Sequence, residues 1–248
     1  MIDLSGKAAL ITGASSGLGA HFSRVLARAG ARVVLAARRE EALKGVEGEI
    51  NAGGGVATCV KLDVTDPASV SALEGSLGDI DIVVNNAGIV HSASALDQSE
   101  ADWDAVMDTN LKGMFLVAQA AGRAMSRGGR AGSIINVASI LGLRQAGNIL
   151  PYAVSKAGVI QMTKVLALEF ARFGIRVNAL APGYVETDLN RDFWDTEQGK
   201  AMIRRIPQRR LGRLEDLDGP LRLLASEESS FMTGSVLVID GGHLVSGL

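Results

Sequence analysis

Short apolar runs alternate with longer segments of helical spacing along the whole chain. The runs occupy residues 7–12, 32–36, 55–62, 80–84, 133–138, 175–181 and 235–239. Apolar residues spaced three or four apart predict one helix directly after the first run and another that begins at residue 67. The same spacing predicts helices over residues 40–52, 100–123, 151–174 and 214–225. Buried strands that alternate with helices predict an α/β fold with a doubly wound, mainly parallel sheet and helices on both faces.

The alternation continues without a linker, a repeat or a low-complexity tract, so all 248 residues are expected to form a single domain, residues 1–248. One segment, about 188–207, lacks periodicity and carries large apolar residues among charges, including Phe193 and Trp194. We expect this irregular segment to form a lid over the substrate.

Composition narrows the class of protein. The 25 basic and 27 acidic residues nearly cancel, so we expect no nucleic-acid or membrane partner. No basic leader and no long apolar run occur, and the single Cys59 fits a reducing, cytoplasmic compartment. The three histidines, His21, His91 and His243, are scattered, so no metal site is expected.

A glycine-rich turn follows the first predicted strand. It reads TGxxxGxG, and its candidate nucleotide-binding residues are Gly13, Ser15, Ser16, Gly17, Leu18 and Gly19. Glycines let backbone N–H groups and a helix N-terminus approach a pyrophosphate closely. A purely structural turn is the alternative, but the position in the first strand–helix unit favours a nucleotide.

The end of the second predicted strand bears on the choice of cofactor. An acid there would bind the ribose hydroxyls of NAD, whereas an arginine accepts the 2′-phosphate of NADP. The chain offers Arg38 and Arg39, with no acid before Glu40. This favours NADP(H), with Arg38 as the main partner and Ser15 or Arg39 assisting. NAD(H) stays possible, since both arginines could simply be solvated.

Polar residues also follow the next predicted strands. Asp63 ends what is expected to be a central strand, where it could meet the adenine edge. Asn85 and Asn86 follow the fourth run, and their amides could tie neighbouring strands together. Asp66 is expected to cap the helix that begins with Pro67.

The most unusual chemistry lies at the start of the predicted helix 151–174. Tyr152 and Lys156 are four residues apart, so their side chains rise from one face of the helix. A fixed positive charge lowers the pKa of a neighbouring phenol, which could then donate or accept a proton. Asn110 is placed inside a predicted helix although asparagine is a poor helix former, and Ser139 ends the fifth strand. Each of these residues could alone be structural.

Taken together, these motifs resemble the short-chain dehydrogenases/reductases (SDR) of the type that carries TGxxxGxG and YxxxK. The matching residues are Thr12-Gly13-x-x-x-Gly17-x-Gly19, Asn85-Asn86-Ala87-Gly88, Asn110, Ser139, Tyr152-x-x-x-Lys156 and Pro182-Gly183, in the family's order and spacing over the full length. The resemblance implies a seven-stranded Rossmann fold and a homotetramer, with a dimer as the alternative.

The resemblance also implies roles for individual residues. Tyr152 would exchange a proton with the substrate oxygen, Ser139 would hydrogen-bond that oxygen, and Lys156 would hold the nicotinamide ribose and lower the phenol pKa. Asn110 would support a water that joins Lys156 to solvent. The implied cofactor contacts are Asp63 and Val64 for adenine, Asn86, Ala87 and Gly88 for the inner ribose region, and Val185 and Thr187 for the carboxamide. Pro182 and Gly183 are also expected to bind the cofactor.

The function expected from these features is NADP(H)-dependent interconversion of a ketone and a secondary alcohol. A 3-oxoacyl-thioester reductase is the nearest alternative, in which Arg127, Arg130 and Arg172 could meet an acidic carrier protein. A nucleotide-sensing scaffold without turnover is less favoured, because it would not need a proton donor. Five arginines over residues 204–213 are expected to be solvated or to contact another subunit, with docking of an acidic partner as the lesser option.

The expected substrate pocket is mostly apolar, which favours a hydrophobic or aromatic ketone. Its candidate residues are Ile140, Leu141, Gln145, Asn148, Tyr184, Phe193 and Trp194.

Overall fold

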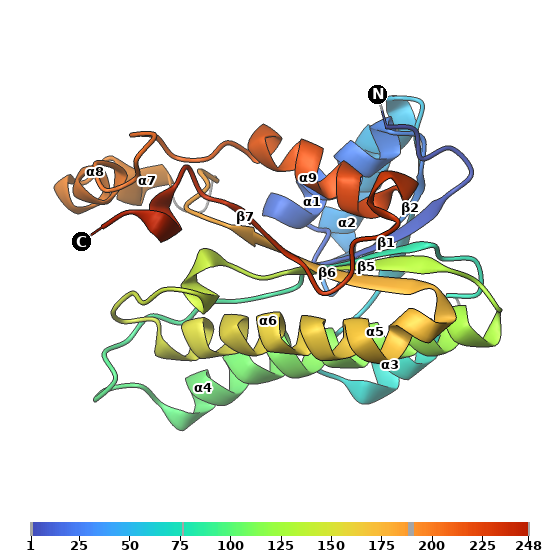
Figure 1. Cartoon of the computed structure of the whole chain (residues 1–248), viewed down its shortest axis with the longest axis horizontal. Helices are drawn as coiled ribbons and strands as arrows, with labels where there is room; N and C mark the ends of the chain where they lie inside the picture. The colour runs from blue at the N-terminus through green and yellow to red at the C-terminus, as the bar shows by residue number, and fades with distance from the viewer. Residues whose placement is uncertain (1, 76, 188–190, 248) are drawn as a thin grey trace.

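A seven-stranded parallel sheet forms the centre of the molecule (Figure 1). The structure is a computed structural model that describes residues 2–75, 77–187 and 191–247. The strands are β1 (Ala8–Thr12), β2 (Arg32–Ala37), β3 (Val56–Lys61), β4 (Ile82–Asn85), β5 (Gly132–Val137), β6 (Ile175–Pro182) and β7 (Val236–Ile239). They are ordered β3-β2-β1-β4-β5-β6-β7, and each neighbouring pair is parallel. The predicted sheet is confirmed.

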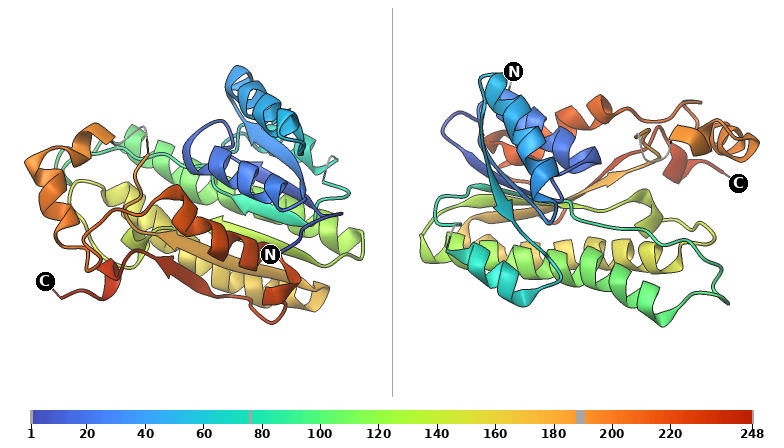
Figure 2. Two further views of the ribbon diagram at one scale, coloured as in Figure 1. Left: turned by 90° about the horizontal axis from the view of Figure 1, so that it is seen from above. Right: turned by 180° about the vertical axis from the view of Figure 1, so that it is seen from behind.

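Helices cover both faces of the sheet (Figures 1 and 2). One face is packed by α1 (Gly17–Arg28), α2 (Glu40–Ala52) and α9 (Asp218–Ala225). The other is packed by α3 (Pro67–Glu74), α5 (Gly113–Arg127) and α6 (Leu150–Phe170), and α4 (Glu100–Met107) packs against α6. Each face has its own apolar core, because strands buried on both sides need an apolar cover on each.

The direction of the chain along the sheet reverses between β1 and β4. Open α/β sheets bind ligands outside the carboxyl ends of the strands at such a reversal point. The glycine turn after β1 and the Asn85–Gly88 segment after β4 therefore flank the expected binding crevice. The same strand order corrects one expectation, because β3 lies at the edge of the sheet and Asp63 does not follow a central strand.

Local signals place the helices largely as predicted. Asp66 accepts a hydrogen bond from the Ala68 backbone N–H and caps α3, with Pro67 in the first turn. Pro151 lies in the first turn of α6, and Gly174, at φ +70°, closes the short 3-10 turn that follows this helix.

Three predicted segments differ from the structure. The expected helix 100–123 is divided, because a π-helical segment, Asp108–Lys112, separates α4 from α5. A 3-10 turn, Leu214–Leu217, precedes α9 and shortens the expected helix 214–225. The segment 188–207 is not irregular where it is described: it forms α7 (Arg191–Trp194) and α8 (Glu197–Ile203), and the Thr196 hydroxyl caps the latter. Residues 188–190 lie outside the described part.

The described residues contain no helix that is long and apolar enough to span a membrane.

Candidate active site

Tyr152 and Lys156 lie on the first two turns of α6, beside the carboxyl end of β5. The Lys156 Nζ is 5.6 Å from the centre of the Tyr152 ring and donates a 2.7 Å hydrogen bond to the Val137 carbonyl. The side chain of Lys156 is only 3% exposed, and burial lowers its pKa to about 8. Lys156 is therefore a cation held in place by a backbone carbonyl.

The phenol of Tyr152 titrates in the opposite direction from the one expected. Its dense surroundings raise its pKa, a hydrogen bond with the Ser139 side chain opposes the rise, and nearby Tyr184 adds to it. The expected lowering is not found in the protein alone, where the cost of burying a phenolate dominates. Tyr152 is held in the protonated, donating form.

Ser139 has both features considered from the sequence, since it caps a turn and lies beside Tyr152. Its hydroxyl accepts a 3.1 Å hydrogen bond from the Leu141 N–H and so opens the 3-10 turn Ile140–Gly142. The same side chain lies close enough to Tyr152 to oppose the rise in the pKa of the phenol. One hydroxyl thus caps a turn and lies beside the phenol.

Asn110 lies in the π-helical segment and is completely buried. Its amide pairs with both backbone groups of Ile89, each at 2.8 Å, and donates to the Ser155 hydroxyl at 3.2 Å. Ser155 in turn donates to the Tyr152 carbonyl at 2.7 Å. Asn110 therefore connects the segment after β4 to the turn of α6 that carries Tyr152, and π-helical turns are frequent at functional sites.

The glycine turn has the form needed to hold a nucleotide. A side chain at Gly13 would meet the Ala87 backbone at 2.9 Å, so only glycine permits this close approach of the two loops. Over Gly17 nothing lies within 4 Å of the position of an added Cβ, which leaves room for a phosphate. Ser16 makes no side-chain cap at the start of α1, and no acid lies in its first turn. The helix N-terminus can thus receive an anion.

The basic residues after β2 lie at the same edge. The Arg39 guanidinium hydrogen-bonds the Ser15 and Ser16 hydroxyls at 3.0 and 2.7 Å. Burial opposes the lowered pKa of Asp63, hydrogen bonds from Thr65 cause most of the lowering, and the exposed Arg38 lies near enough to add to it. Two cations beside a glycine turn fit the 2′-phosphate and pyrophosphate of NADP.

The remaining expected cofactor residues lie in or next to the segments that follow the strands at this edge. The Thr12 hydroxyl accepts hydrogen bonds from the N–H groups of Asn86 and Ala87 and so ties the first two loops together. The others are Leu18 and Gly19 in the first turn of α1, Val64 after β3, Gly88 after β4, Pro182 at the end of β6, and Gly183, Val185 and Thr187 after it.

The expected substrate residues are brought together only in part. Tyr184 packs edge-on against Trp194, with ring centres 5.4 Å apart, and Trp194 packs against Phe193 at 4.9 Å. Ile140 and Leu141 form the turn beside Ser139. No described contact joins Gln145 or Asn148 to this aromatic group, and both are exposed.

Sequence reasoning missed two residues of this group. His243 lies 5.5 Å from the Tyr184 ring, and Arg144 donates a hydrogen bond to the His243 carbonyl. The position of His243 just beyond the last strand was a usable signal, because every loop after a parallel strand reaches the same edge.

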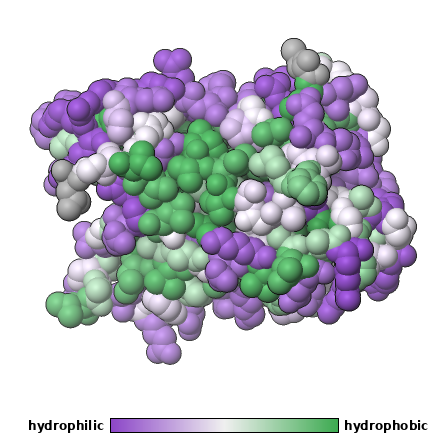
Figure 3. Space-filling model, in the orientation of Figure 1, coloured by the Kyte–Doolittle hydropathy of each residue, from purple (hydrophilic) through white to green (hydrophobic). Residues whose placement is uncertain are grey.

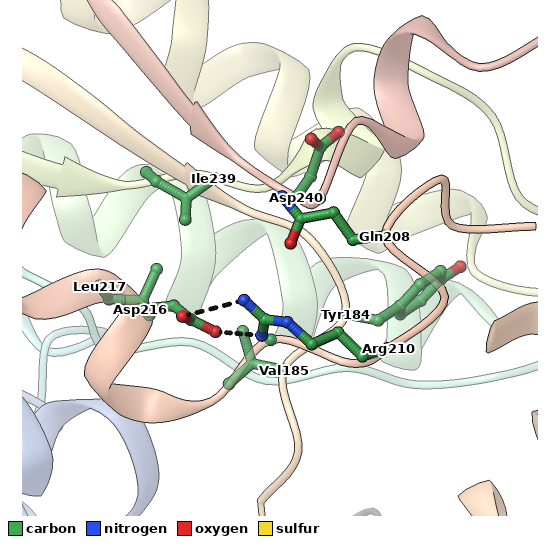
Figure 4. A pocket seen from close by; sticks show the side chains of 10 residues that line it. Tyr184, Val185, Gln208, Arg210, Asp216, Leu217, Ile239 and Asp240 are labelled. Atoms are coloured by element: carbon green, nitrogen blue, oxygen red, sulfur yellow. Dashed lines mark hydrogen bonds and ion pairs between the residues drawn. The ribbon is translucent and has the colours of Figure 1, made fainter.

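A cavity of about 180 Å³ adjoins the aromatic group (Figure 4). It is lined by the loops after β6 and β7 and shares Tyr184 with the group. Arg210 and Asp216 form a two-bond ion pair on its wall, at 2.6 and 3.2 Å. None of the four catalytic candidates is among the residues that line this cavity.

The arginines considered for carrier docking lie elsewhere. Arg127 ends α5 and Arg130 precedes β5, while Arg172 precedes β6. Arg130 donates to two backbone carbonyls, and Arg172 lies over the Phe173 ring. All three are at the amino-end edge of the sheet, about 20 Å of strand away from Tyr152. Within one chain, these arginines therefore lie away from the catalytic candidates.

Among the residues that the structure describes, no group of three or more histidine, cysteine or acidic side chains is placed to hold a metal ion.

Known proteins resemble this chain over nearly its whole length. The family described as enoyl-(acyl carrier protein) reductase matches residues 13–243. A gluconate 5-dehydrogenase from Gluconobacter oxydans is 40% identical over 99% of this chain and 98% of its own length. A 3-oxoacyl-(acyl-carrier-protein) reductase from Rickettsia bellii is 39% identical over 99% of this chain and 100% of its own.

Solved structures agree with these relatives. A gluconate 5-dehydrogenase from Burkholderia cenocepacia in complex with NADP and tartrate superposes with a TM-score of 0.93 at 38% identity, covering 99% of this chain and 98% of its own. A short-chain type dehydrogenase/reductase from Mycobacterium marinum superposes with a TM-score of 0.91 at 45% identity, covering 98% and 97%. The chain therefore belongs to the short-chain dehydrogenase/reductase family of oxidoreductases.

Proposed function

We propose that this protein is an NADP(H)-dependent oxidoreductase that interconverts a ketone and a secondary alcohol, with Tyr152 as general acid and base. The observation that carries the proposal is the meeting of Tyr152, Ser139 and Lys156 at the carboxyl end of β5. A phenol, a hydroxyl and a buried cation in one cluster can protonate a carbonyl oxygen and stabilise the charge that develops on it.

In the reducing direction Tyr152 gives its proton to the carbonyl oxygen of the substrate, and in the oxidising direction it takes that proton back. Ser139 hydrogen-bonds the same oxygen. Lys156 stabilises the phenolate that Tyr152 becomes, and its pKa of about 8 lets it pass a proton onward near neutral pH. Asn110 holds the segments around Tyr152 in place and supports the path to solvent.

The nicotinamide, when bound, supplies or accepts the hydride. The residues that would hold the cofactor fit it, because the glycine turn gives close backbone approach and α1 presents a free N-terminus. Arg38, with Arg39 and Ser15, would bind the 2′-phosphate. NADP is present in the relative from Burkholderia cenocepacia, which supports this choice.

Reduction of a 3-oxoacyl thioester is the second candidate. Relatives with that name are as similar to the chain as the gluconate dehydrogenase is. A carrier protein would have to approach from the carboxyl-end edge, where the arginines of residues 204–213 lie. Arg210 there is already paired with Asp216, while Arg204, Arg205 and Arg209 are exposed.

We also propose that the protein acts in the cytoplasm as a homotetramer whose α7–α8 segment closes over the substrate. Exposed apolar side chains on α5 and α6, such as Phe115 and Leu168, support self-association, with relative exposures of 39% and 81%. Apolar surface also occupies the middle of the face drawn in Figure 3, where Figure 1 places β7 and α6. A dimer is the alternative assembly, and sedimentation velocity distinguishes the two.

The proposal is tested by titrating the purified protein with NADPH and with NADH and following nucleotide fluorescence. We expect tighter binding of NADPH, and loss of that preference in Arg38→Asp. Arg28→Asp is the matched control, since Arg28 is an exposed arginine at the far end of α1. A preference for NADH would reject the 2′-phosphate site. Binding of NADPH without turnover of any ketone or alcohol would favour a sensing scaffold instead.

A further inference from the structure

The aromatic group at the carboxyl-end edge of the sheet also contains charged side chains and buried polar atoms. We define the rim cluster as Arg144, Tyr184, Trp194 and His243. Tyr184 is its centre, with the Trp194 and His243 rings at 5.4 and 5.5 Å, and Arg144 is joined to it through the His243 carbonyl. Arg144 follows β5, Tyr184 and Trp194 follow β6, and His243 follows β7.

Arg144 is a cation without a described acidic partner. Its guanidinium has five N–H donors, and its one side-chain hydrogen bond among the described residues goes to the His243 carbonyl. Asp240 lies near His243, but its carboxylate accepts from the backbone N–H groups of Gly242 and Leu244. Arg205 lies near enough to His243 to add a second positive charge. The electrostatic potential at the rim cluster is therefore positive.

Two more polar atoms of the cluster are buried without a partner in the described structure. They are the indole Nε1 of Trp194 and the Nδ1 of His243, on side chains that are only 8% and 6% exposed. Buried polar groups are almost always hydrogen-bonded in native proteins. Both atoms have almost no exposed surface, so an oxygen-rich anion could pair with them only after a side chain of the cluster turns outward.

The rim cluster is close to the catalytic cluster. Arg144 lies on the turn that begins at Ser139, and its N–H bonds the Ile140 carbonyl at 2.8 Å. Tyr184 lies close enough to Tyr152 to influence its titration, and Arg144 similarly influences Tyr184. A small molecule whose carbonyl meets Tyr152 and Ser139 can thus extend toward Arg144.

We propose that the substrate is a small oxo or hydroxy acid whose carboxylate is bound by Arg144 at the rim cluster. This inference rests on the proposed function and names the substrate class for that same site. It replaces the expected hydrophobic ketone: the aromatic rings of the cluster form walls, and the cation selects the anionic end of the substrate. Arg144 is then the residue that determines specificity, and it takes no part in proton transfer.

The test compares oxo acids of three to six carbons with their own methyl esters, in NADPH-dependent reduction. We expect wild type to favour the best acid over its ester by 10²-fold or more in kcat/KM. Arg144→Gln should lower kcat/KM for the acid by about 10²-fold, chiefly through KM, and leave the ester within threefold. Arg144→Lys should restore part of the preference, and Arg28→Gln, an exposed arginine at the far end of α1, should change nothing.

Each other outcome overturns the inference. Equal use of acid and ester by wild type rejects it without any variant. An equal loss for acid and ester in Arg144→Gln, with NADPH affinity unchanged, assigns Arg144 a structural role. A preference for a carrier-bound thioester that does not respond to Arg144 also rejects it. Reduction of neutral ketones alone would sink only this inference, whereas failure to bind NADPH would sink the proposed function.

Discussion

The catalytic cluster and the rim cluster lie side by side at one edge of the sheet, and they are built in opposite ways. In the catalytic cluster, Lys156 is bound by the Val137 carbonyl and Asn110 by both backbone groups of Ile89. In the rim cluster, Trp194 and His243 each keep a buried polar atom without a described partner. The comparison indicates that the protein supplies the contacts of the catalytic residues and leaves those of the rim to the substrate.

The difference also has an energetic side. Holding Lys156 charged in a buried position without a described carboxylate opposes folding, which the depressed pKa of about 8 expresses. Functional sites often contain such an unfavourable buried charge, and the rest of the fold offsets its cost in stability. The rim cluster has no buried cation like Lys156, so substitutions there should change the free energy of unfolding least.

The largest expected effect on stability concerns Lys156→Met. Between about pH 8 and 10.5 the unfolded chain binds a proton that the folded chain has lost, so the stability of wild type rises with pH across this window. Relative to Lys156→Met, wild type should gain up to about 3 kcal/mol between pH 7 and 10.5. Urea unfolding without nucleotide measures it. Lys164→Met, on the exposed face of α6, should show no such pH dependence.

A loss of comparable size is expected for Asn110→Ala. The substitution leaves the partly buried N–H and C=O of Ile89 unpaired and should lower the free energy of unfolding by about 2–3 kcal/mol. Asn51→Ala is a matched control, because Asn51 makes the same pair of bonds to Ala57 from an exposed position. Equal losses for the two variants would show that Asn110 has no special role in supporting the site.

The smallest effect is expected at the rim. Trp194→Phe removes a buried N–H that has no described partner, so the free energy of unfolding should change by no more than about 1 kcal/mol. Chemical denaturation at fixed protein concentration measures the change. A loss well above that of Asn51→Ala would mean that the indole is bound by the protein itself, and the contrast between the two clusters would disappear.

What the sequence could predict follows from the range of the interactions. The spacing of Tyr152 and Lys156 is a property of a single helix, and the order of strands and helices follows from local periodicity, so both were predicted correctly. The cap at Asp66 is equally local.

The features that the sequence did not predict depend on distant residues. The π-helical turn at Asn110 is fixed by bonds to Ile89 and Ser155, which are 21 and 45 residues away. The edge position of β3 depends on how the strands pair, and the contact of Arg144 with His243 joins positions 99 residues apart. No local pattern contains that information.

The most direct test of the central assignment is the pH dependence of a single turnover. Enzyme loaded with NADPH is mixed with its best ketone or oxo acid, and the decay of NADPH fluorescence is followed from pH 6 to 11 in wild type, Tyr152→Phe and Tyr184→Phe. If Tyr152 is the proton donor, the rate for wild type falls only above about pH 10, because burial raises the pKa of the phenol. Tyr152→Phe is then at least 10²-fold slower with a flat profile. Tyr184→Phe keeps the shape of the wild-type profile. A Tyr152→Phe enzyme that binds NADPH and reduces substrate at the wild-type rate, with the wild-type profile, would contradict the assignment.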